Sequence, residues 1–242
     1  MNSRLAPVPS SGRSVADPVH RLILAVDVEG STQRLNPAKA ELRRIMYALL
    51  DRALRATGIG YKHLEPLCDR GDGVLILIRP HDDVPKTLPL RLLIPRLAAL
   101  LVEHNATVAQ PNLRLRLRVV FHAGEVHNDG WGFFGEDLDI AFRLLDAPAV
   151  KKALKNALAS PLVLVVSEEI HSAIVRQGYV DAGPYEQSVN LRVAERRVRG
   201  WVNLPVPAPA ERALPAGRPK TPLRAASLAI ALPPSQPEGA TA

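Results

Sequence analysis

Two short acidic segments contain residue types that can bind metal ions. Asp27 comes directly after the apolar run 22–26, and Asp72 lies in a Gly-Asp-Gly turn before the apolar run 74–78. Both runs are typical of buried strands, and two aspartates at the ends of neighbouring strands can share a pair of divalent cations. Such a pair activates an attacking hydroxyl group and holds a leaving phosphate group, so the two segments predict phosphoryl or nucleotidyl transfer.

Each aspartate also has a simpler interpretation. Asp27 alone could cap the helix region that follows it, and the turn around Asp72 alone could be an ordinary hairpin turn. We favour the metal pair because Asp72 ends a strand that is expected beside the strand of Asp27. His122 and His127 also lie near carboxylates in the sequence, but their spacing does not resemble a zinc site and favours ordinary hydrogen-bonding roles.

The hydrophobic pattern predicts the elements that must position these residues. Leu42, Met46 and Leu49 belong to a series of apolar residues at helical spacing, and 113–121 has the period of two of a strand. The expected helices cover 38–56, 93–104 with Pro95 in the first turn, 137–146 and 168–175. The expected strands cover 22–26, 61–69, 74–79, 113–121, 161–166 and a final hairpin over 189–204.

This order of elements predicts a single α+β domain over 20–205. The order βαββαβ with further αβ elements after it indicates a ferredoxin-like, palm-type sandwich. We expect its helices to cover one face of a largely antiparallel sheet and to leave the other face for a partner. The segments 1–19 and 206–242 are rich in Pro, Ala, Ser and Gly, and we expect both to be disordered.

Composition excludes several classes of protein. With 242 residues, 47% of them hydrophobic and 23% charged, the chain is expected to be soluble, and it lacks an apolar run long enough for a membrane span. The single cysteine, Cys68, excludes a disulfide framework and favours the cytoplasm. The formal net charge of +7 suits a small polyanion, whereas an aromatic content of 4% argues against nucleic-acid binding through base stacking.

Five segments, in order along the chain, resemble the catalytic domains of class III nucleotidyl cyclases, the adenylate and guanylate cyclases. The matches are DVEGST at 27–32, Gly71 and Asp72, RVVFHAGEV at 118–126, GEDLDIAFRL at 135–144 and VSEEI at 166–170. Each match alone is weak, but their order and spacing over 20–205 make the resemblance specific.

The resemblance implies conversion of a nucleoside triphosphate into a 3′,5′-cyclic nucleotide and pyrophosphate, with two Mg²⁺ or Mn²⁺ ions at each site. It assigns Asp27, Asp72 and the carbonyl group of Val28 to the metal ions. Arg143 is expected to stabilise the transition state from the second subunit of a homodimer. The remaining substrate contacts that it implies come from the backbone amides of Glu29, Gly30, Ser31 and Thr32.

The sequence also departs from the pattern of that family. Asp139 stands where the catalytic helix normally has an asparagine. Cys68 and Gly132 stand where two side chains normally recognise the purine base, so the base is left undefined. The triphosphate-binding lysine has no equivalent, and its candidate replacements are Arg192, Arg196 and Arg197.

Two functions therefore stay open. The first is an active cyclase, in which Asp139 and Cys68 belong to the site. The second is a catalytically weak or inactive relative that binds nucleotide and metal as a regulatory module. We favour the first because Asp27, Asp72 and Arg143 are all present, and a purely structural descendant has no need of paired carboxylates at a sheet edge.

Overall fold

The computed structural model describes residues 17–181 and 184–208. In this part of the chain eight strands form one sheet, in the order β2-β3-β1-β4-β6-β8-β7, with β5 paired to β4. All neighbouring strands are antiparallel except β4 and β6. The strands are β1 (Val19–Val28), β2 (Cys68–Asp69), β3 (Gly73–Ile78), β4 (Leu117–Asn128), β5 (Phe133–Phe134), β6 (Leu162–Ser167), β7 (Glu186–Val193) and β8 (Arg196–Asn203).

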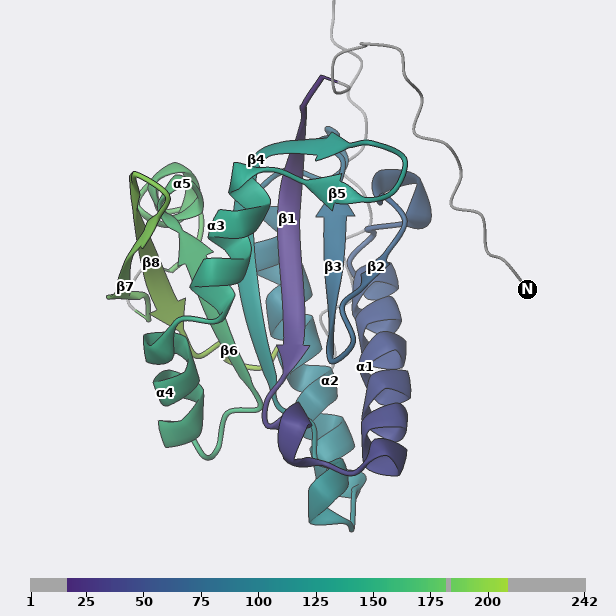
Figure 1. The fold of residues 1–242 in the computed structure, drawn as a ribbon. Coiled ribbons are helices and arrows are strands. Elements are labelled where there is room, and N and C mark those ends of the chain that lie inside the picture. Colours follow the sequence, from purple (N-terminus) through teal and green to yellow (C-terminus); the bar gives the residue numbers. More distant parts are fainter. Residues whose placement is uncertain (1–16, 182–183, 209–242) are drawn as a thin grey trace, which may run out of the picture.

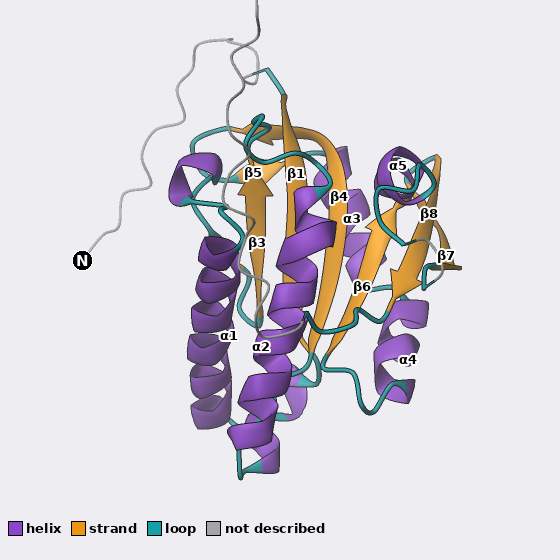
Figure 2. Cartoon of the chain, turned by 180° about the vertical axis from the view of Figure 1, so that it is seen from behind, coloured by secondary structure: helices purple, strands orange, loops and turns teal. Residues whose placement is uncertain are grey.

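Helices cover both faces of this sheet, so the prediction that one face stays open is wrong. Figure 2 shows α1 and α2 over one face, whereas α3 and α4 lie over the opposite face in Figure 1. The helices are α1 (Asn36–Ala56), α2 (Ile94–Thr107), α3 (Glu136–Leu145), α4 (Pro148–Asn156) and the short α5 (Glu168–Ile170).

The apolar run in β1 explains the two layers. Its side chains alternate between the faces, so Leu24 packs with α1 and α2 while Ile23 packs in the cluster that contains α3. Every residue from Leu22 to Val26 is buried, as expected for a strand covered on both sides. A continuous apolar run is therefore the sequence signature of this arrangement. The predicted α+β class and the order βαββαβ over β1 to β4 are confirmed.

Several predicted boundaries need correction. The strand expected from residue 113 begins at Leu117, since a 3₁₀ turn (Pro111–Leu113) comes before it. The first hairpin arm, expected over 61–69, forms ladder pairs only at Cys68–Asp69, because a 3₁₀ turn (Tyr61–His63) occupies its start. The helix expected to start at 93 begins with Ile94, and Pro95 lies in its first turn as predicted.

The expectations for the chain ends concern mostly residues outside the described part. Residues 1–16 and 209–242, which contain most of both expected disordered segments, lie outside it. Among the described helices, none combines the length and the hydropathy that crossing a membrane requires.

One ion-pair cluster joins the segment before β2 to the sheet. Glu65 accepts hydrogen bonds from Arg21 of β1, at 2.7 and 3.0 Å, and from Arg79 after β3, at 2.9 Å to each of its oxygens. The side chain of Glu65 is 12% exposed. The hydrogen bond from Arg79, followed by the hydrogen bond and charge of Arg21, lowers the pKa of Glu65 to about 2.

We expect Glu65→Gln to lower the free energy of unfolding by about 2 kcal/mol at pH 7, because two guanidinium groups lose their charged partner. A depressed folded-state pKa contributes stability above pH 4.5 that is lost as the pH falls toward 2. The variant should therefore lose less stability than the wild type between pH 5 and pH 3. Urea unfolding across that range measures both effects, with Glu195→Gln, at a side chain 98% exposed, as the control. Equal pH slopes in all three proteins would contradict this account.

Candidate active site

The site begins where β1 ends. Asp27, the second-last residue of β1, lies opposite Gly73 of β3 on one side and Arg118 of β4 on the other. A Cβ atom at Gly73 would lie 2.3 Å from the carbonyl oxygen of Val26. Only glycine therefore allows β3 to start this close to β1.

Asp27 forms a two-pronged ion pair with Arg118. The guanidinium Nε and Nη2 donate to the two carboxylate oxygens at 2.8 and 2.7 Å. Burial raises the pKa of Asp27, the hydrogen bond and charge of Arg118 oppose that rise, and the charge of Asp72 adds to it. Asp27 is thus a desolvated carboxylate with one counter-charge, an arrangement that a bound cation would stabilise.

Asp72 lies at the tip of the β2–β3 hairpin, next to the end of β1. Its main-chain carbonyl accepts a hydrogen bond of 3.0 Å from the amide of Val28, which holds the hairpin tip against β1. Its half-buried carboxylate has no hydrogen bond or ion pair with any described residue. The predicted neighbours Asp27 and Asp72 are therefore close enough to interact electrostatically.

A cavity of about 440 Å³ opens beside Asp72. It lies between the hairpin tip and the start of α1, which are side by side in Figure 1. Asp27 is not among its lining residues, so the cavity meets the acidic pair on the Asp72 side. Its lining residues are Ser31, Thr32, Lys39, Arg43, Asp69, Gly71 and Asp72.

Two cations on α1 line this cavity, and neither was predicted from the sequence. Lys39 makes no side-chain hydrogen bond or ion pair with the described residues. Arg43 pairs with Asp69, which also accepts a hydrogen bond of 3.1 Å from Tyr47. The hydrogen bond from Arg43 is the main reason why the pKa of Asp69 falls to about 2. Lys39 and Arg43 are four residues apart and therefore lie on the same face of the predicted helix. This spacing was the sequence signal for a pair of cations.

The turn after β1 presents free backbone donors to the same region. Among the described residues, the amides of Gly30, Ser31 and Thr32 have no hydrogen-bond partner. The amide of Glu29 donates to the carbonyl of Arg116 at 2.9 Å, so its predicted role as a phosphate donor is wrong. Ser31 and Thr32 lie in a separate 3₁₀ turn (Ser31–Gln33), which Gly30 precedes, and α1 begins only at Asn36.

Asp139 and Arg143 lie on the exposed face of α3. They are four residues apart, and neither side chain has a partner among the described residues. Leu138, Ala141 and Leu144 hold the opposite face of α3 against the sheet. Asp146, just after α3, interacts electrostatically with Asp27, so this end of the helix is directed toward the acidic pair.

A buried hydrogen-bond network fixes α3 to the sheet. His122 of β4 is 0% exposed and contacts the Ser167 hydroxyl at 2.7 Å and a carboxylate oxygen of Asp137 at 3.2 Å. Asp137 also accepts a hydrogen bond of 2.7 Å from the amide of Glu125. The Asp137 carboxylate lies against Gly124, where a Cβ atom would clash with the carboxylate. Because Ser167 is fully buried, this serine–histidine–aspartate set has no access to substrate and has a structural role, as predicted for His122.

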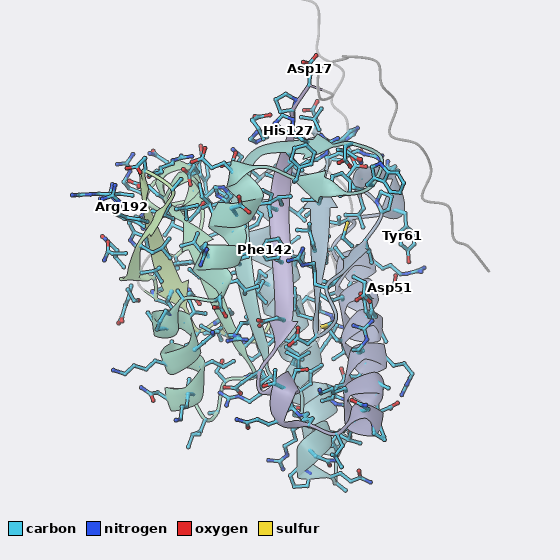
Figure 3. All side chains as sticks on the ribbon, in the orientation of Figure 1. Asp17, Asp51, Tyr61, His127, Phe142 and Arg192 are labelled. Atoms are coloured by element: carbon cyan, nitrogen blue, oxygen red, sulfur yellow. The ribbon has the colours of Figure 1, made fainter. Side chains whose placement is uncertain are left out.

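The structure places one of the two base-recognition candidates, Cys68, on the β2–β3 hairpin that also carries Asp72, where it pairs with Leu75 of β3. Cys68 packs in the cluster with α3, and burial raises the pKa of its thiol. Gly132 lies in the β4–β5 turn, at the opposite end of the sheet from Asp27. Arg196 of β8 forms an ion pair of 3.0 Å with Glu169 of α5. Figure 3 shows Arg192 at the outer edge of the sheet, away from α1. These arginines and Arg197 of β8 are thus remote from the cavity.

No protein-family model and no curated protein matches the sequence. Solved structures do match, and the following three match at low identity. The guanylyl cyclase Cya2 is 17% identical with a TM-score of 0.54, and the match covers 82% of this chain and 98% of that chain. An adenylate/guanylate cyclase/hydrolase from Silicibacter pomeroyi is 19% identical with a TM-score of 0.54, covering 78% and 98%. The catalytic core of a rhodopsin-guanylyl cyclase is 12% identical with a TM-score of 0.52, covering 79% and 99%.

The chain therefore has the fold of class III cyclase catalytic domains, and the predicted fold is confirmed.

Proposed function

We propose that this protein is a nucleotidyl cyclase that converts a nucleoside triphosphate into a 3′,5′-cyclic nucleotide and pyrophosphate. One observation carries the proposal: the Asp27–Asp72 pair lies beside a cavity lined by Lys39, Arg43 and two residues of the turn after β1, Ser31 and Thr32. Carboxylates bind divalent cations, and cationic side chains with free amides bind phosphate groups. A metal–triphosphate complex requires both.

The acidic pair fits Mg²⁺ or Mn²⁺. The Asp72 carboxylate has no partner in the described part of the chain, and each oxygen of Asp27 keeps a lone pair beyond its bond to Arg118. Oxygen donors alone suit these hard cations, and we assign the Val28 carbonyl to the same set. When bound, two such ions lower the pKa of an attacking hydroxyl and neutralise the leaving phosphates.

The remaining residues bind and orient the substrate. Lys39, Arg43 and the amides of Gly30, Ser31 and Thr32 hold the phosphate groups. The ribose 3′-hydroxyl oxygen forms a bond to the α-phosphorus, and the bond from that phosphorus to the departing pyrophosphate breaks. This geometry leaves the base unassigned, since Cys68 and Gly132 offer little for its recognition.

Arg143 completes the site of a second subunit in this proposal. Its exposed guanidinium has no partner among the described residues. It can therefore stabilise the negative charge that develops on the phosphate group in the transition state. Asp139 lies one turn before it on the same exposed face. In a homodimer that places the α3 face of one chain against the acidic pair of the other, each chain supplies Arg143 and Asp139 to the site of its partner.

The test is to incubate the full chain with each of the four nucleoside triphosphates and Mn²⁺, and to identify products by mass spectrometry. A cyclic nucleotide and pyrophosphate in equal amounts support the proposal. Metal-dependent triphosphate binding without turnover supports instead the regulatory module, a function favoured by the ion pair of Asp27 with Arg118 and by the presence of Asp139. Absence of binding to all four nucleotides overturns both.

Lys39→Ala should weaken triphosphate binding about tenfold, because a free charged donor to phosphate contributes about 1.5 kcal/mol. In an active enzyme the loss should appear in KM with little change in kcat. If the protein binds the triphosphate without turning it over, calorimetric titration with the triphosphate measures the same loss of affinity as a change in Kd. Lys152→Ala, on α4 over the other face of the sheet, is the matched control. Equal affinities for the two variants would show that Lys39 does not contact the phosphates.

A further inference from the structure

A second group of ligand-type side chains lies at the opposite end of β3 from Gly73. His63 ends the 3₁₀ turn before β2, and its carbonyl accepts a hydrogen bond of 2.7 Å from the amide of Arg79, just after β3. His81 and Asp83 follow in a tight turn that is closed by a hydrogen bond of 2.9 Å from Val84 to His81. β3 runs upward in Figure 1, so this group and the acidic pair lie at opposite ends of the sheet.

The three side chains converge. One ligand atom from each of His63, His81 and Asp83 lies within 4.8 Å of the other two. The imidazole rings of His63 and His81 have centroids 5.1 Å apart, and His81 Nδ1 lies 3.5 Å from a carboxylate oxygen of Asp83. An ion at about 2 Å from each atom needs ligand separations of about 3.3 Å, so the side chains would close around it by small rotations.

An independent observation concerns His63 alone. The residue is 3% exposed, and neither of its ring nitrogens has a hydrogen-bond partner among the residues that the structure describes. Buried polar groups nearly always have a partner, because leaving one unpaired costs free energy.

We propose that His63, His81 and Asp83 form a binding site for a transition-metal ion of the Zn²⁺ type. Two imidazole nitrogens and one carboxylate oxygen suit Zn²⁺ and Co²⁺ better than Mg²⁺, which prefers oxygen ligands alone. Three protein ligands leave a fourth position for water. The ion would supply the partner that a buried ring nitrogen of His63 lacks.

The surroundings allow an ion to enter. His81 and Asp83 are 51% and 66% exposed at their side chains, and His81 lines an open cavity of about 350 Å³. Lys62 lies 3.8 Å from a carboxylate oxygen of Asp83, but its side chain is 73% exposed and free to move away. The bound ion would tie the segment before β2 to the turn after β3.

The test is Zn²⁺ titration of the chelator-treated full chain, followed by calorimetry and thermal unfolding. We expect one ion per chain, a Kd of about 1–10 μM, and a Tm raised by at least about 5 °C at 1 mM Zn²⁺. Co²⁺ should give the visible absorption of a histidine-bound site. His81→Ala and Asp83→Asn should each weaken binding at least about tenfold, since each removes one exposed ligand without touching the core.

His20→Ala is the matched control, because His20 lines the same cavity but does not belong to the group. It should keep wild-type Zn²⁺ affinity. An Asp27→Asn/Asp72→Asn variant should also keep it, which separates this site from the acidic pair. No stoichiometric Zn²⁺ binding, or equal binding by the wild type and both ligand variants, would overturn the proposal.

Discussion

Asp72→Asn is expected to reduce formation of cyclic nucleotide by about 10³-fold or more while leaving the fold intact, since it removes the negative charge that a metal ion requires. The amide side chain has nearly the same shape as the carboxylate, and the Asp72 carboxylate holds no other described group in place. The main-chain bond from Val28 to the Asp72 carbonyl is unaffected. Activity with Mn²⁺ and the melting temperature are measured together, with Glu195→Gln as the control.

The same variant tests the homodimer. In a two-fold dimer, Asp72→Asn and Arg143→Ala damage the same site from different chains. A mixed dimer keeps one site in which both residues are intact, so an equimolar mixture should regain about a quarter of wild-type activity by random pairing. Each variant alone should stay inactive. No recovery on mixing would exclude the assignment of Arg143 to the second subunit, and full activity of Asp72→Asn alone would exclude the metal pair.

Arg118→Leu is expected to lower the free energy of unfolding by about 3 kcal/mol at pH 8, because it leaves Asp27 desolvated without its counter-charge. Burial already raises the pKa of Asp27, so protonation of the carboxyl group should relieve the loss as the pH falls toward 5. Combining the change with Asp27→Asn should recover most of the stability, since no charge then remains to be neutralised.

Divalent metal makes this variant informative about function. If Asp27 holds a metal ion, Mn²⁺ should raise the stability of Arg118→Leu more than that of the wild type, because the ion replaces the missing guanidinium. Urea unfolding with and without Mn²⁺ measures the difference. Arg192→Leu, at an exposed position on β7, is the control. An equal response of wild type and variant to Mn²⁺ would argue against a metal ion at Asp27.

The sequence was sufficient to predict the core of the site, because the relevant signals are local. The apolar runs on either side of Asp27 and Asp72 predict β1 and β3, and a Gly-Asp-Gly turn predicts a hairpin tip. Adjacency then follows from the antiparallel pairing of these two strands.

The rest depends on tertiary contacts that no local pattern contains. Arg116 and Arg118 resemble the solvent-facing side of an alternating strand, but β4 pairs with β1 and brings them to Glu29 and Asp27. Lys39 and Arg43 resemble the solvated face of an amphipathic helix until the hairpin tip lies beside them. The open sheet face was wrongly predicted because a fully buried strand has no alternation to show which face is covered.

One contact within the chain, between α3 and the hairpin, links the two sites of the proposed dimer. Phe142 of α3 is labelled in Figure 3. The guanidinium carbon of Arg70, at the hairpin turn, lies over the Phe142 ring, 4.2 Å from the centroid of that ring. Arg70 is two residues from Asp72, and Phe142 is adjacent to Arg143. In the dimer that we propose, a hairpin that shifts when one site fills therefore moves the arginine that serves the other site. Substrate affinity at the two sites is then linked, and the enzyme should show cooperative kinetics.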